Sequence, residues 1–395
     1  MIHTKEKKKV LFVYPDMGIG GSTTSLVSLL NTFDYHKYDI DLALYDTGYI
    51  QERYLSEKIK VLPACRKYQH TVADKCIKAF FYIVTIIKLL FSRRHINKKS
   101  IYTEFTVLYN SKRIASKYDV AIGYLEGWAD SYVARNIKQC KKIMWIHTDI
   151  VNNHEVDHSD MRLYLKKADT IVCVSEKLLE GISSTFPEFE KKTIFLPNIL
   201  SKKYVNERAR ELIDESEIDI INAYSGIKII SVCRFSVFIK GIDRMVGIAK
   251  KLKEDGVNFR WYLIGDGKEK KQVAEMVKKN DIQDHFFLLG EKNNPYPFMY
   301  KCDILALPSR AEGKPMVVTE AQMLGIIPVV TRYASSEEQI RHGVDGLISD
   351  NNEESYYHML YSIIRDKDTI KKMKNQILQK DYSNTIDIQK YYSVL

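Results

Sequence analysis

The sequence alternates between strand-like and helix-like segments, and this alternation constrains the fold more than any other feature. Residues 10–14 (VLFVY) have the length and apolar character of a buried strand, and residues 22–30 carry apolar side chains at helical spacing. Similar strand-like runs follow at residues 38–44, 120–123, 142–146, 170–174 and 193–196. Buried strands alternating with helices are typical of a parallel sheet covered on both faces, so we predict an α/β fold.

The same alternation restarts in the second half of the chain. Residues 200–227 are charge-rich and weakly patterned, and we interpret them as a connection that contains a short surface helix. Strands are then predicted at residues 228–232, 259–264, 285–289, 303–307 and 327–331, and helices at residues 241–253, at 268–279 and from 353 onward. Because 395 residues exceed one ordinary hydrophobic core, we expect two domains of similar size.

The chain is basic, with a formal net charge of +10 and an isoelectric point near 9.0. This charge favours an anionic partner, either nucleotide phosphates or an acidic membrane surface, and since no nucleic-acid-binding module is recognisable, we predict that no nucleic acid is bound. Six cysteines without a C-x-x-C pair favour reduced, buried thiols in a cytosolic protein over disulfides or a zinc site. The apolar run near the N-terminus is too short for a signal peptide, and no segment reaches the roughly 18 apolar residues of a membrane span.

Residues 76–99 depart from the α/β pattern. Residues 79–87 are apolar except for Thr85, and a cluster of basic side chains follows at residues 93–99. One interpretation is a helix that lies in a membrane interface, with its cations on anionic lipid headgroups. The other is a core helix with a solvated basic end.

Two glutamates eight positions apart, Glu312 and Glu320, lie in the run SRAEGKPMVVTEAQMLG. A strand, a short turn and a helix N-terminus form the usual phosphate site of an α/β fold. Pro315 suits the first helical position, which would leave the N–H groups of residues 316–318 (Met316, Val317 and Val318) free for phosphate oxygens. The two carboxylates are unexpected for pure anion binding, but they suit a ligand that carries hydroxyls as well as phosphates.

Three further groups lie at predicted strand ends. Arg234 and Lys240 follow the strand at residues 228–232, and two cations facing a helix N-terminus suit a diphosphate, although solvated loop charges are the common alternative. Gly20 and Gly21 close the first strand–helix turn, where glycine lets a ligand approach the backbone. His147 ends the strand at residues 142–146, at an edge where α/β sheets bind ligands, although a lone histidine is more often structural.

Taken together, these segments resemble the retaining glycosyltransferases of the GT-B fold, specifically glycosyltransferase family 4, over nearly the whole chain. The resemblance rests on the glycine-rich first turn and on the runs IGYLEGW, WIHTDI, VCVSEK, LPNI, R…KG, LIGDG and EGKPMVVTEA. The sequences of the WIHTDI and YLEGW runs are similar to those of bacterial enzymes of capsular or other surface polysaccharide assembly. The resemblance implies two Rossmann-like, doubly wound domains that face a central cleft. Residues 1–200 would bind the acceptor, residues 201–375 would bind the nucleotide-sugar donor, and residues 376–395 would pack back on the N-terminal domain.

The resemblance also implies a role for each candidate residue. Arg234 and Lys240 would hold the donor diphosphate, Glu320 would bind the ribose hydroxyls, and Glu312 would contact the transferred sugar. His147 would approach that sugar from the N-terminal domain. The remaining predicted donor-site residues are Gly20, Gly21, Gly290, Lys314, Pro315, Met316, Val317 and Val318. Base contacts would come from the segment after Gly290. No metal or cofactor is expected, and the donor, which we expect to be a UDP-sugar, is a substrate.

The sequence departs from the family pattern at three points. Arg234 and Lys240 are six positions apart, where the pattern has five. Cys233 stands where glycine is usual, and Lys314 stands where an apolar residue is common. The extra cation at Lys314 indicates either a donor with an acidic sugar or a substitution that is typical of a subfamily.

The predicted reaction is transfer of a sugar to an acceptor hydroxyl with retention of the anomeric configuration. We expect a lipid-linked glycan acceptor of bacterial surface or capsular polysaccharide synthesis, and a cytoplasmic protein that associates with the inner face of the membrane. Two alternatives are a non-catalytic GT-B subunit that supports a partner transferase and a GT-B sugar-nucleotide epimerase.

Overall fold

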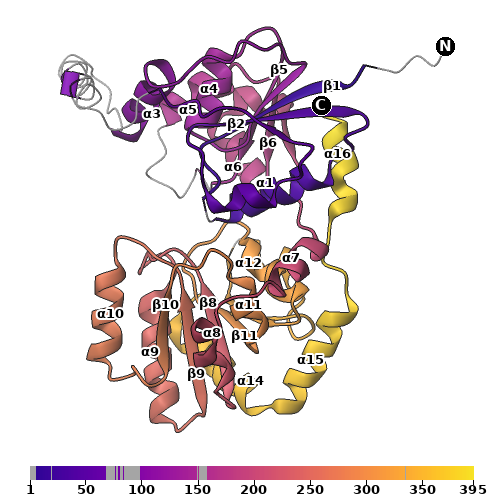
Figure 1. Ribbon diagram of the computed structural model, residues 1–395. Coiled ribbons are helices and arrows are strands. Elements are labelled where there is room, and N and C mark those ends of the chain that lie inside the picture. Colours follow the sequence, from indigo (N-terminus) through magenta and orange to yellow (C-terminus); the bar gives the residue numbers. More distant parts are fainter. Residues whose placement is uncertain are drawn as a thin grey trace. The chain divides into compact units, whose positions relative to one another are not determined.

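The chain folds into two compact units. Unit 1 comprises Met1–Ile199 and Thr385–Leu395, and unit 2 comprises Leu200–Asn384 (Figure 1). This computed structural model describes residues 6–18, 20–67, 76, 79–80, 83, 98–148, 150, 158–333 and 335–395. The roles that the sequence assigns to the two halves, acceptor binding and donor binding, stay predictions.

The described strands of unit 1 form one parallel sheet in the order β3-β2-β1-β4-β5-β6-β7. They are β1 Lys8–Tyr14, β2 Tyr38–Leu44, β3 Lys60–Val61, β4 Val120–Gly123, β5 Lys141–Ile146, β6 Thr170–Cys173 and β7 Thr193–Phe195. The helices and 3-10 turns are α1 Gly21–Thr32, η1 Ile50–Tyr54, α3 Lys98–Leu108, α4 Trp128–Asn136, α5 His158–Leu165, α6 Glu176–Thr185, η2 Pro187–Lys192, η3 Thr385–Asp387 and α16 Ile388–Tyr392. Strand β1 pairs with β2 on one side and β4 on the other, so the strand order reverses there.

Unit 2 repeats this plan with six parallel strands in its described residues, in the order β10-β9-β8-β11-β12-β13. They are β8 Ile227–Val232, β9 Phe259–Ile264, β10 Phe286–Gly290, β11 Ile304–Leu307, β12 Ile327–Thr331 and β13 Leu347–Ser349. The helices are α7 Lys202–Ala209, α8 Glu215–Asn222, α9 Ile242–Glu254, α10 Lys270–Lys279, α11 Tyr296–Tyr300, α12 Met316–Met323, α13 Ser336–Gln339, α14 Glu353–Arg365 and α15 Lys367–Gln379. The order reverses between β8 and β11, which pair directly.

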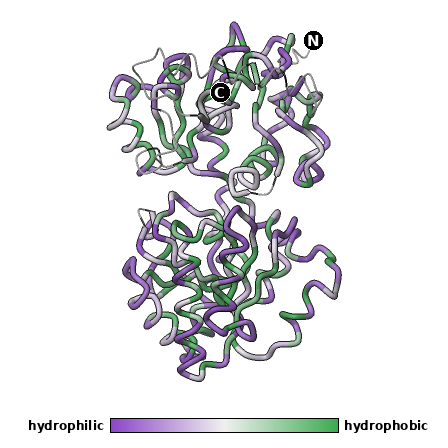
Figure 2. Tube along the Cα trace, turned by 90° about the vertical axis from the view of Figure 1, so that its left-hand side faces the viewer, coloured by the Kyte–Doolittle hydropathy of each residue, from purple (hydrophilic) through white to green (hydrophobic). Residues whose placement is uncertain are grey.

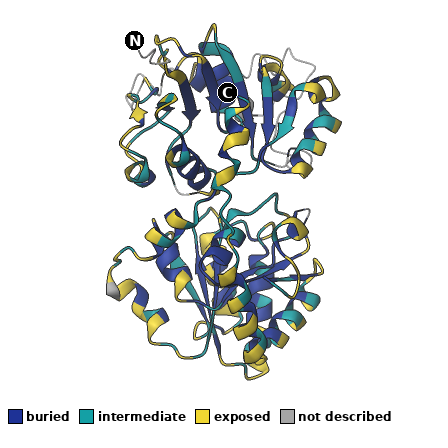
Figure 3. Ribbon diagram, turned by 90° about the vertical axis from the view of Figure 1, so that its right-hand side faces the viewer, coloured by how far each residue is buried: buried dark blue, intermediate teal, exposed yellow. Residues whose placement is uncertain are grey.

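Each sheet forms the core of its own unit. Figure 3 shows the strands largely buried and the covering helices exposed along their outer faces. Hydrophobic and hydrophilic stretches alternate along the chain in both units (Figure 2). Strands β1, β4 and β11 are apolar runs, and their central residues are almost fully buried. This follows from the double cover of helices, which removes both faces of a parallel sheet from water.

The structure confirms the predicted α/β alternation in both halves, with shifts of one or two residues at element ends. Helix α6 follows β6, and the Ser175 side chain caps it by accepting a hydrogen bond from the Leu178 N–H at 3.2 Å. The interpretation of residues 200–227 as a connection with one surface helix is wrong. They hold two helices, and Val205 and Arg208 of α7 are buried within unit 2.

The last residues of the chain complete the core of unit 1. The ring of Tyr391 stacks on Trp145 with 5.3 Å between ring centroids, and its hydroxyl donates a hydrogen bond to the Pro197 carbonyl. The ring of Tyr392 stacks on Tyr38 with 4.9 Å between centroids, and its hydroxyl accepts a hydrogen bond from the Asp34 N–H at 2.7 Å. The C-terminal segment therefore contributes aromatic rings to the sheet on which it packs.

Candidate functional site

Three candidate residues of unit 2, Arg234, Lys240 and Glu312, lie where its strand order reverses. Strands β8 and β11 are neighbours, and the chain leaves their carboxyl ends toward α9 and α12 respectively. In an open α/β sheet, this point leaves a crevice in which ligands bind. Arg234 and Lys240 follow β8, and Glu312 follows β11, so the topology brings the two loops to one edge of the sheet.

Lys240 and Glu312 form an ion pair at this edge. The Lys240 Nζ lies 2.8 Å from both Oε1 and Oε2 of Glu312, and the Ser309 hydroxyl donates to Oε1 at 2.8 Å. The Glu312 side chain is 7% exposed and that of Lys240 is 25% exposed. The pair couples the two loops, although their residues are far apart in the sequence.

Arg234 has a different environment from Lys240. It is exposed, and no described residue forms an ion pair or a side-chain hydrogen bond with its guanidinium. Its neighbour Cys233 carries a thiol whose pKa burial raises to about 12, although the charge of Lys240 acts in the opposite direction. The thiol is therefore protonated and uncharged at neutral pH. Because the Arg234 guanidinium is exposed and has no partner among the described side chains, it is available to bind an anion.

Helix α12 begins one residue later than predicted. Pro315 is the N-cap, with φ −66° and ψ 118°, and Met316 is the first helical residue. The prediction that the Val318 N–H is free is wrong, because this N–H donates a hydrogen bond to the Pro315 carbonyl at 3.3 Å. Among the described residues, the N–H groups of Met316 and Val317 have no partner, as expected in the first turn of a helix.

Lys314, just before this helix, is engaged within unit 2. Its Nζ lies 2.9 Å from Oε2 of Glu338 on α13, and both side chains are partly buried. The Ser335 hydroxyl donates to the Gly313 carbonyl in the same region. The cation that departs from the family pattern therefore has an internal carboxylate to balance it.

Glu320 is buried on α12, with 6% of its surface exposed. The Tyr296 hydroxyl donates a hydrogen bond to its Oε1 at 3.0 Å. Burial raises the pKa of Glu320 to about 7, while the Tyr296 hydrogen bond and the charge of Arg208 oppose that rise. No described residue hydrogen-bonds its second carboxylate oxygen, Oε2.

Gly290 ends β10 in a left-handed conformation, with φ +70°. Side chains rarely adopt this conformation, so the turn itself favours glycine at this position. A Cβ there would meet nothing within 4 Å, so space at residue 290 is left open by the described protein.

His147 lies in unit 1, at the end of β5 and beside the reversal of that sheet. Its ring packs on Tyr124 with 5.1 Å between centroids, and its buried Nε2 has no partner among the described residues. Burial lowers the pKa of His147 to about 4, although the Glu126 carboxylate acts to raise it. The imidazole is therefore neutral at physiological pH, and its Nε2 is left unbonded by the described residues.

Glu126 is a candidate that we did not single out from the sequence. It follows β4, and its carboxylate accepts hydrogen bonds from the His147 N–H, at 3.0 Å, and from the Thr148 hydroxyl. The signal in the sequence was a carboxylate shortly after a strand that adjoins the point where the strand order reverses. Glu126 holds the backbone from which His147 projects.

Gly20 and Gly21 begin α1 after β1, with Gly20 as the N-cap. The backbone of Gly20 is extended, with φ 171°, so this conformation alone does not demand glycine. A Cβ on Gly20 would meet only the Thr23 Oγ1, at 3.9 Å. A side chain on Gly20 would therefore not clash with any described residue, and glycine at this position leaves open space beside the backbone.

The membrane-interface prediction for residues 76–99 falls largely outside the described residues. In the part of the chain that the structure describes, no helix combines the length and apolarity that crossing a bilayer requires, and no His, Cys, Asp and Glu side chains gather as a metal site. All six cysteines are free thiols. The expectation that they are buried is confirmed for Cys65, Cys173 and Cys302, whereas Cys140 and Cys233 are half-buried and Cys76 is exposed.

Parts of the chain are similar in sequence to known glycosyltransferases. Residues 216–380 match the model of the family described as glycosyl transferases group 1. An uncharacterized glycosyltransferase of Methanocaldococcus jannaschii is 35% identical over 115 residues, which are 29% of this chain and 31% of that protein. The N-acetylgalactosamine-N,N'-diacetylbacillosaminyl-diphospho-undecaprenol 4-alpha-N-acetylgalactosaminyltransferase of Campylobacter jejuni is 27% identical over 219 residues, 54% of this chain and 56% of that enzyme. The chain thus spans about a third to just over half of the length of these two relatives.

Solved structures match over nearly the whole length. Anabaena HepE in complex with UDP and glucose superposes with a TM-score of 0.72 at 14% identity, over 98% of each chain. The lipopolysaccharide-biosynthesis glycosyltransferase WaaG superposes with a TM-score of 0.61 at 14% identity, over 98% of this chain and 99% of that one. At this identity the likeness concerns the fold, and it confirms the predicted class of two Rossmann-like units of the GT-B type.

Proposed function

We propose that the protein is a retaining glycosyltransferase that moves a sugar from a nucleotide-diphosphate sugar, which we expect to be a UDP-sugar, to an acceptor hydroxyl. This proposal rests mainly on the Lys240–Glu312 ion pair. The pair lies where the strand order of the unit 2 sheet reverses, in the loops that also hold the exposed Arg234 and lead into α12. Cations and a helix N-terminus at one sheet edge suit a diphosphate, and a carboxylate beside them suits sugar hydroxyls. The match of residues 216–380 to a glycosyltransferase family supports this assignment.

Each residue then has a stated task. Arg234 and Lys240 bind the diphosphate, together with the N–H groups of Met316 and Val317. Donor binding brings phosphate oxygens to Lys240, which exchanges part of its contact with Glu312 for them. Glu312 is thereby released to accept hydrogen bonds from the transferred sugar. The ion pair of the free protein is, in this proposal, the resting form of the donor site.

The nucleoside half of the donor lies toward Glu320. In this proposal, its Oε2, which no described residue bonds, accepts hydrogen bonds from the ribose hydroxyls. The space beside Gly290 admits the base. Lys314 stays paired with Glu338, so we assign no acidic sugar to the donor on its account.

The bond from the sugar C1 to the diphosphate oxygen breaks, and a bond from C1 to the acceptor oxygen forms on the same face. The acceptor proton passes to the leaving diphosphate, which is released as the free nucleotide. Catalysis then rests on orientation and on stabilising the leaving group with fixed cations and backbone N–H groups, so no metal is required. His147, neutral and with its Nε2 unbonded by described residues, is the proposed polar contact from unit 1, and Gly20 and Gly21 leave room at the start of α1.

For the acceptor we propose a lipid-linked glycan of bacterial surface polysaccharide synthesis, used at the inner face of the membrane. The name of the Campylobacter jejuni relative specifies a diphospho-undecaprenol acceptor, and the net charge of +10 suits anionic lipid. Sedimentation with vesicles of phosphatidylglycerol at low salt tests the membrane part. Failure of the protein to sediment with them would refute it.

The reaction is tested by incubating the purified protein with single UDP-sugars and a lipid-linked acceptor pool, and by measuring released UDP. We expect UDP release that depends on the acceptor and survives a metal chelator. Arg234→Ala should lower turnover more than tenfold, whereas Lys271→Ala, an exposed lysine on α10, should not change it. Interconversion of the sugar nucleotide without UDP release would indicate an epimerase, and binding without turnover would indicate a non-catalytic subunit.

A further inference from the structure

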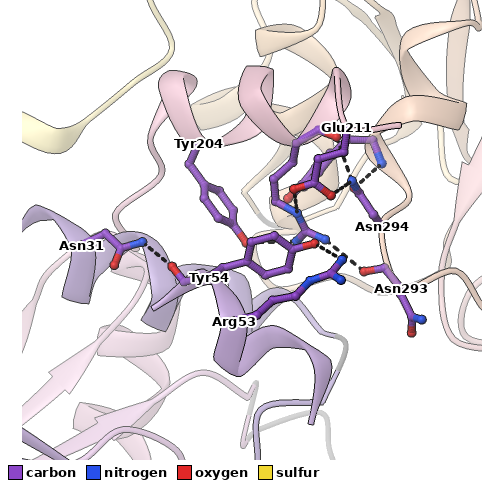
Figure 4. Close-up of polar contacts among 9 residues, drawn as sticks. Asn31, Arg53, Tyr54, Tyr204, Glu211, Asn293 and Asn294 are labelled. Carbon is purple, nitrogen blue, oxygen red and sulfur yellow. Dashed lines mark hydrogen bonds and ion pairs between the residues drawn. The ribbon is translucent and has the colours of Figure 1, made fainter. Parts of the chain in front are cut away.

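A group of polar and aromatic side chains around Glu320 includes residues that neither the predicted motifs nor the proposed reaction uses. It lies in unit 2 and joins α7, the loop after β10, α11 and α12. Figure 4 labels four of its residues, Tyr204, Glu211, Asn293 and Asn294. We call it the α7 cluster, and its members are Tyr204, Arg208, Glu211, Asn293, Asn294, Tyr296 and Glu320.

Arg208 is the centre of the α7 cluster and is only 2% exposed. Its Nη1 donates to the Tyr204 hydroxyl and its Nη2 to the Asn293 carbonyl, each at 3.0 Å. The guanidinium also lies 5.5 Å from the ring centroid of Tyr204 and 5.4 Å from that of Tyr296. A charge buried this deeply is costly unless it is well bonded, so these contacts fix the guanidinium in place.

The loop after β10 is bonded to α7 from both directions. Asn293 offers its carbonyl to Arg208, and Asn294 donates through Nδ2 to the Arg208 carbonyl at 2.7 Å and to Glu211 Oε2 at 2.9 Å. Asn294 is itself buried, with 6% exposed. The loop that follows Gly290 therefore takes its conformation from α7.

Tyr296 connects this loop to the carboxylate of α12. It is the first residue of α11 and is 2% exposed, and its hydroxyl donates to Glu320 Oε1 at 3.0 Å. Burial and the neighbouring Glu320 raise the pKa of Tyr296 well above its ordinary value, so the hydroxyl keeps the proton that it donates. One oxygen of Glu320 is thus fixed by Tyr296, and the other is left for a ligand.

We propose that Arg208 and Tyr296 are positioning residues that assemble the nucleoside half of the donor site, by holding the loop after Gly290 and the Glu320 carboxylate in one fixed arrangement. This inference rests on the proposed function, in which Glu320 binds the ribose and the loop contacts the base. It assigns specificity for the nucleoside to contacts that begin on α7, a helix outside the matched family segment of residues 216–380.

A purely structural role would not require this chemistry. Replacing buried charged groups with well-packed apolar side chains is often neutral or stabilising, so stability alone does not explain a buried arginine at position 208. A carboxylate that must stay ionised to accept two ribose hydroxyls does gain from a nearby positive charge and a donated hydrogen bond. Of the described residues, Tyr296 on α11 and Arg208 on α7 are those that lower the pKa of Glu320.

The test is calorimetric titration of the full chain with UDP and, separately, with inorganic pyrophosphate, between pH 5.5 and pH 9. The variants are Tyr296→Phe and Arg208→Met. Their matched controls are Tyr300→Phe, an exposed tyrosine on the same helix, and Arg210→Met, an exposed arginine at the end of α7. Thermal melting of each variant shows whether it folds.

We expect Tyr296→Phe to weaken UDP binding at pH 7 about fivefold, which is the loss of one hydrogen bond, and to leave pyrophosphate binding unchanged. The pH at which UDP binding is half lost should rise, because the hydrogen bond that lowers the pKa of Glu320 is gone. Glu320→Gln should remove the part of this pH dependence that Tyr296→Phe shifts. Arg208→Met should weaken UDP binding in the same selective way, and the control variants should bind as the unaltered protein does.

The inference is overturned if the unaltered protein binds UDP and both Tyr296→Phe and Arg208→Met bind it with the same affinity and pH midpoint. It is equally overturned if UDP and pyrophosphate binding fall in parallel, since the effect would then be general. Absence of UDP binding to the unaltered protein would instead refute the proposed function. Should Arg208→Met fail to fold, Tyr296→Phe alone decides, because it removes one hydroxyl and leaves the ring.

Discussion

Replacing Lys240 by Met should cost unit 2 more stability than replacing Glu312 by Gln. The carboxylate is the more buried partner, with 7% of its side chain exposed against 25% for the lysine. Removing Lys240 therefore leaves a buried charge without its cation, whereas removing the charge of Glu312 leaves an ammonium that water reaches. Exposed ion pairs contribute about 0–1 kcal/mol, and breaking a buried pair costs about 3–5 kcal/mol.

The Lys240–Glu312 pair falls between these limits. With both N–O distances at 2.8 Å, we expect a loss of about 2 kcal/mol for Lys240→Met and about 1 kcal/mol for Glu312→Gln. The double variant should lose little more than Glu312→Gln alone, because the neutral amide no longer needs a cation. The two single losses should thus fail to add.

Hydrogen exchange of peptides from β8 and β11 measures this effect within unit 2, independently of how unit 1 unfolds. Peptides from β1 and β4 are the internal control, since the substitutions lie in the other unit. Equal losses for the two single variants, or strictly additive losses in the double variant, would refute the reasoning. Equal losses would mean that the difference in burial between the two side chains has no effect, and additive losses would mean that the two side chains act independently.

Three further predictions concern the other candidate residues. Arg234→Ala should leave hydrogen exchange of unit 2 unchanged while it weakens pyrophosphate binding, because no described side chain pairs with Arg234; a large loss of stability would contradict this. Glu126→Gln should lower kcat more than it raises the donor KM, since it loosens the backbone of His147 and Thr148, and an unchanged kcat would count against that role. The folded pKa of His147, about 4, lies below its unfolded value, so its contribution to stability should be present above pH 6.5 and be lost as the pH falls toward 4. Proton NMR should show no titration of this ring between pH 5.5 and pH 8, and a midpoint near 6.5 would contradict the burial argument.

Most of the fold could be predicted because its signals are local. Apolar runs of strand length mark β1, β9 and β12, and each of these strands has a neighbouring strand on both sides. The short strands β3 and β13 escaped prediction, since two or three residues carry no readable period. Their pairing depends on neighbours that are far away in the sequence.

The candidate site was predictable to a lesser degree. Strand ends could be located, so the loops that carry Arg234, Lys240 and Glu312 were expected at one edge of the sheet. Their different environments were not, because the ion pair depends on the path of two loops. The buried Arg208 escaped for another reason: an arginine in a charge-rich stretch is expected to face water, and only the packing of α7 against α11 and α12 reverses that expectation.

The return of the chain to unit 1 has a consequence for synthesis of the protein on the ribosome. Translation produces the strands of unit 1 first, then all of Leu200–Asn384, and only at the end the rings of Tyr391 and Tyr392 that pack on Trp145 and Tyr38. The first unit to emerge therefore waits, with an unfilled aromatic site, until the second has been made. The chain leaves unit 1 at Leu200 and returns to it after Asn384. These two residues hydrogen-bond to each other, and each donates its backbone N–H to the other.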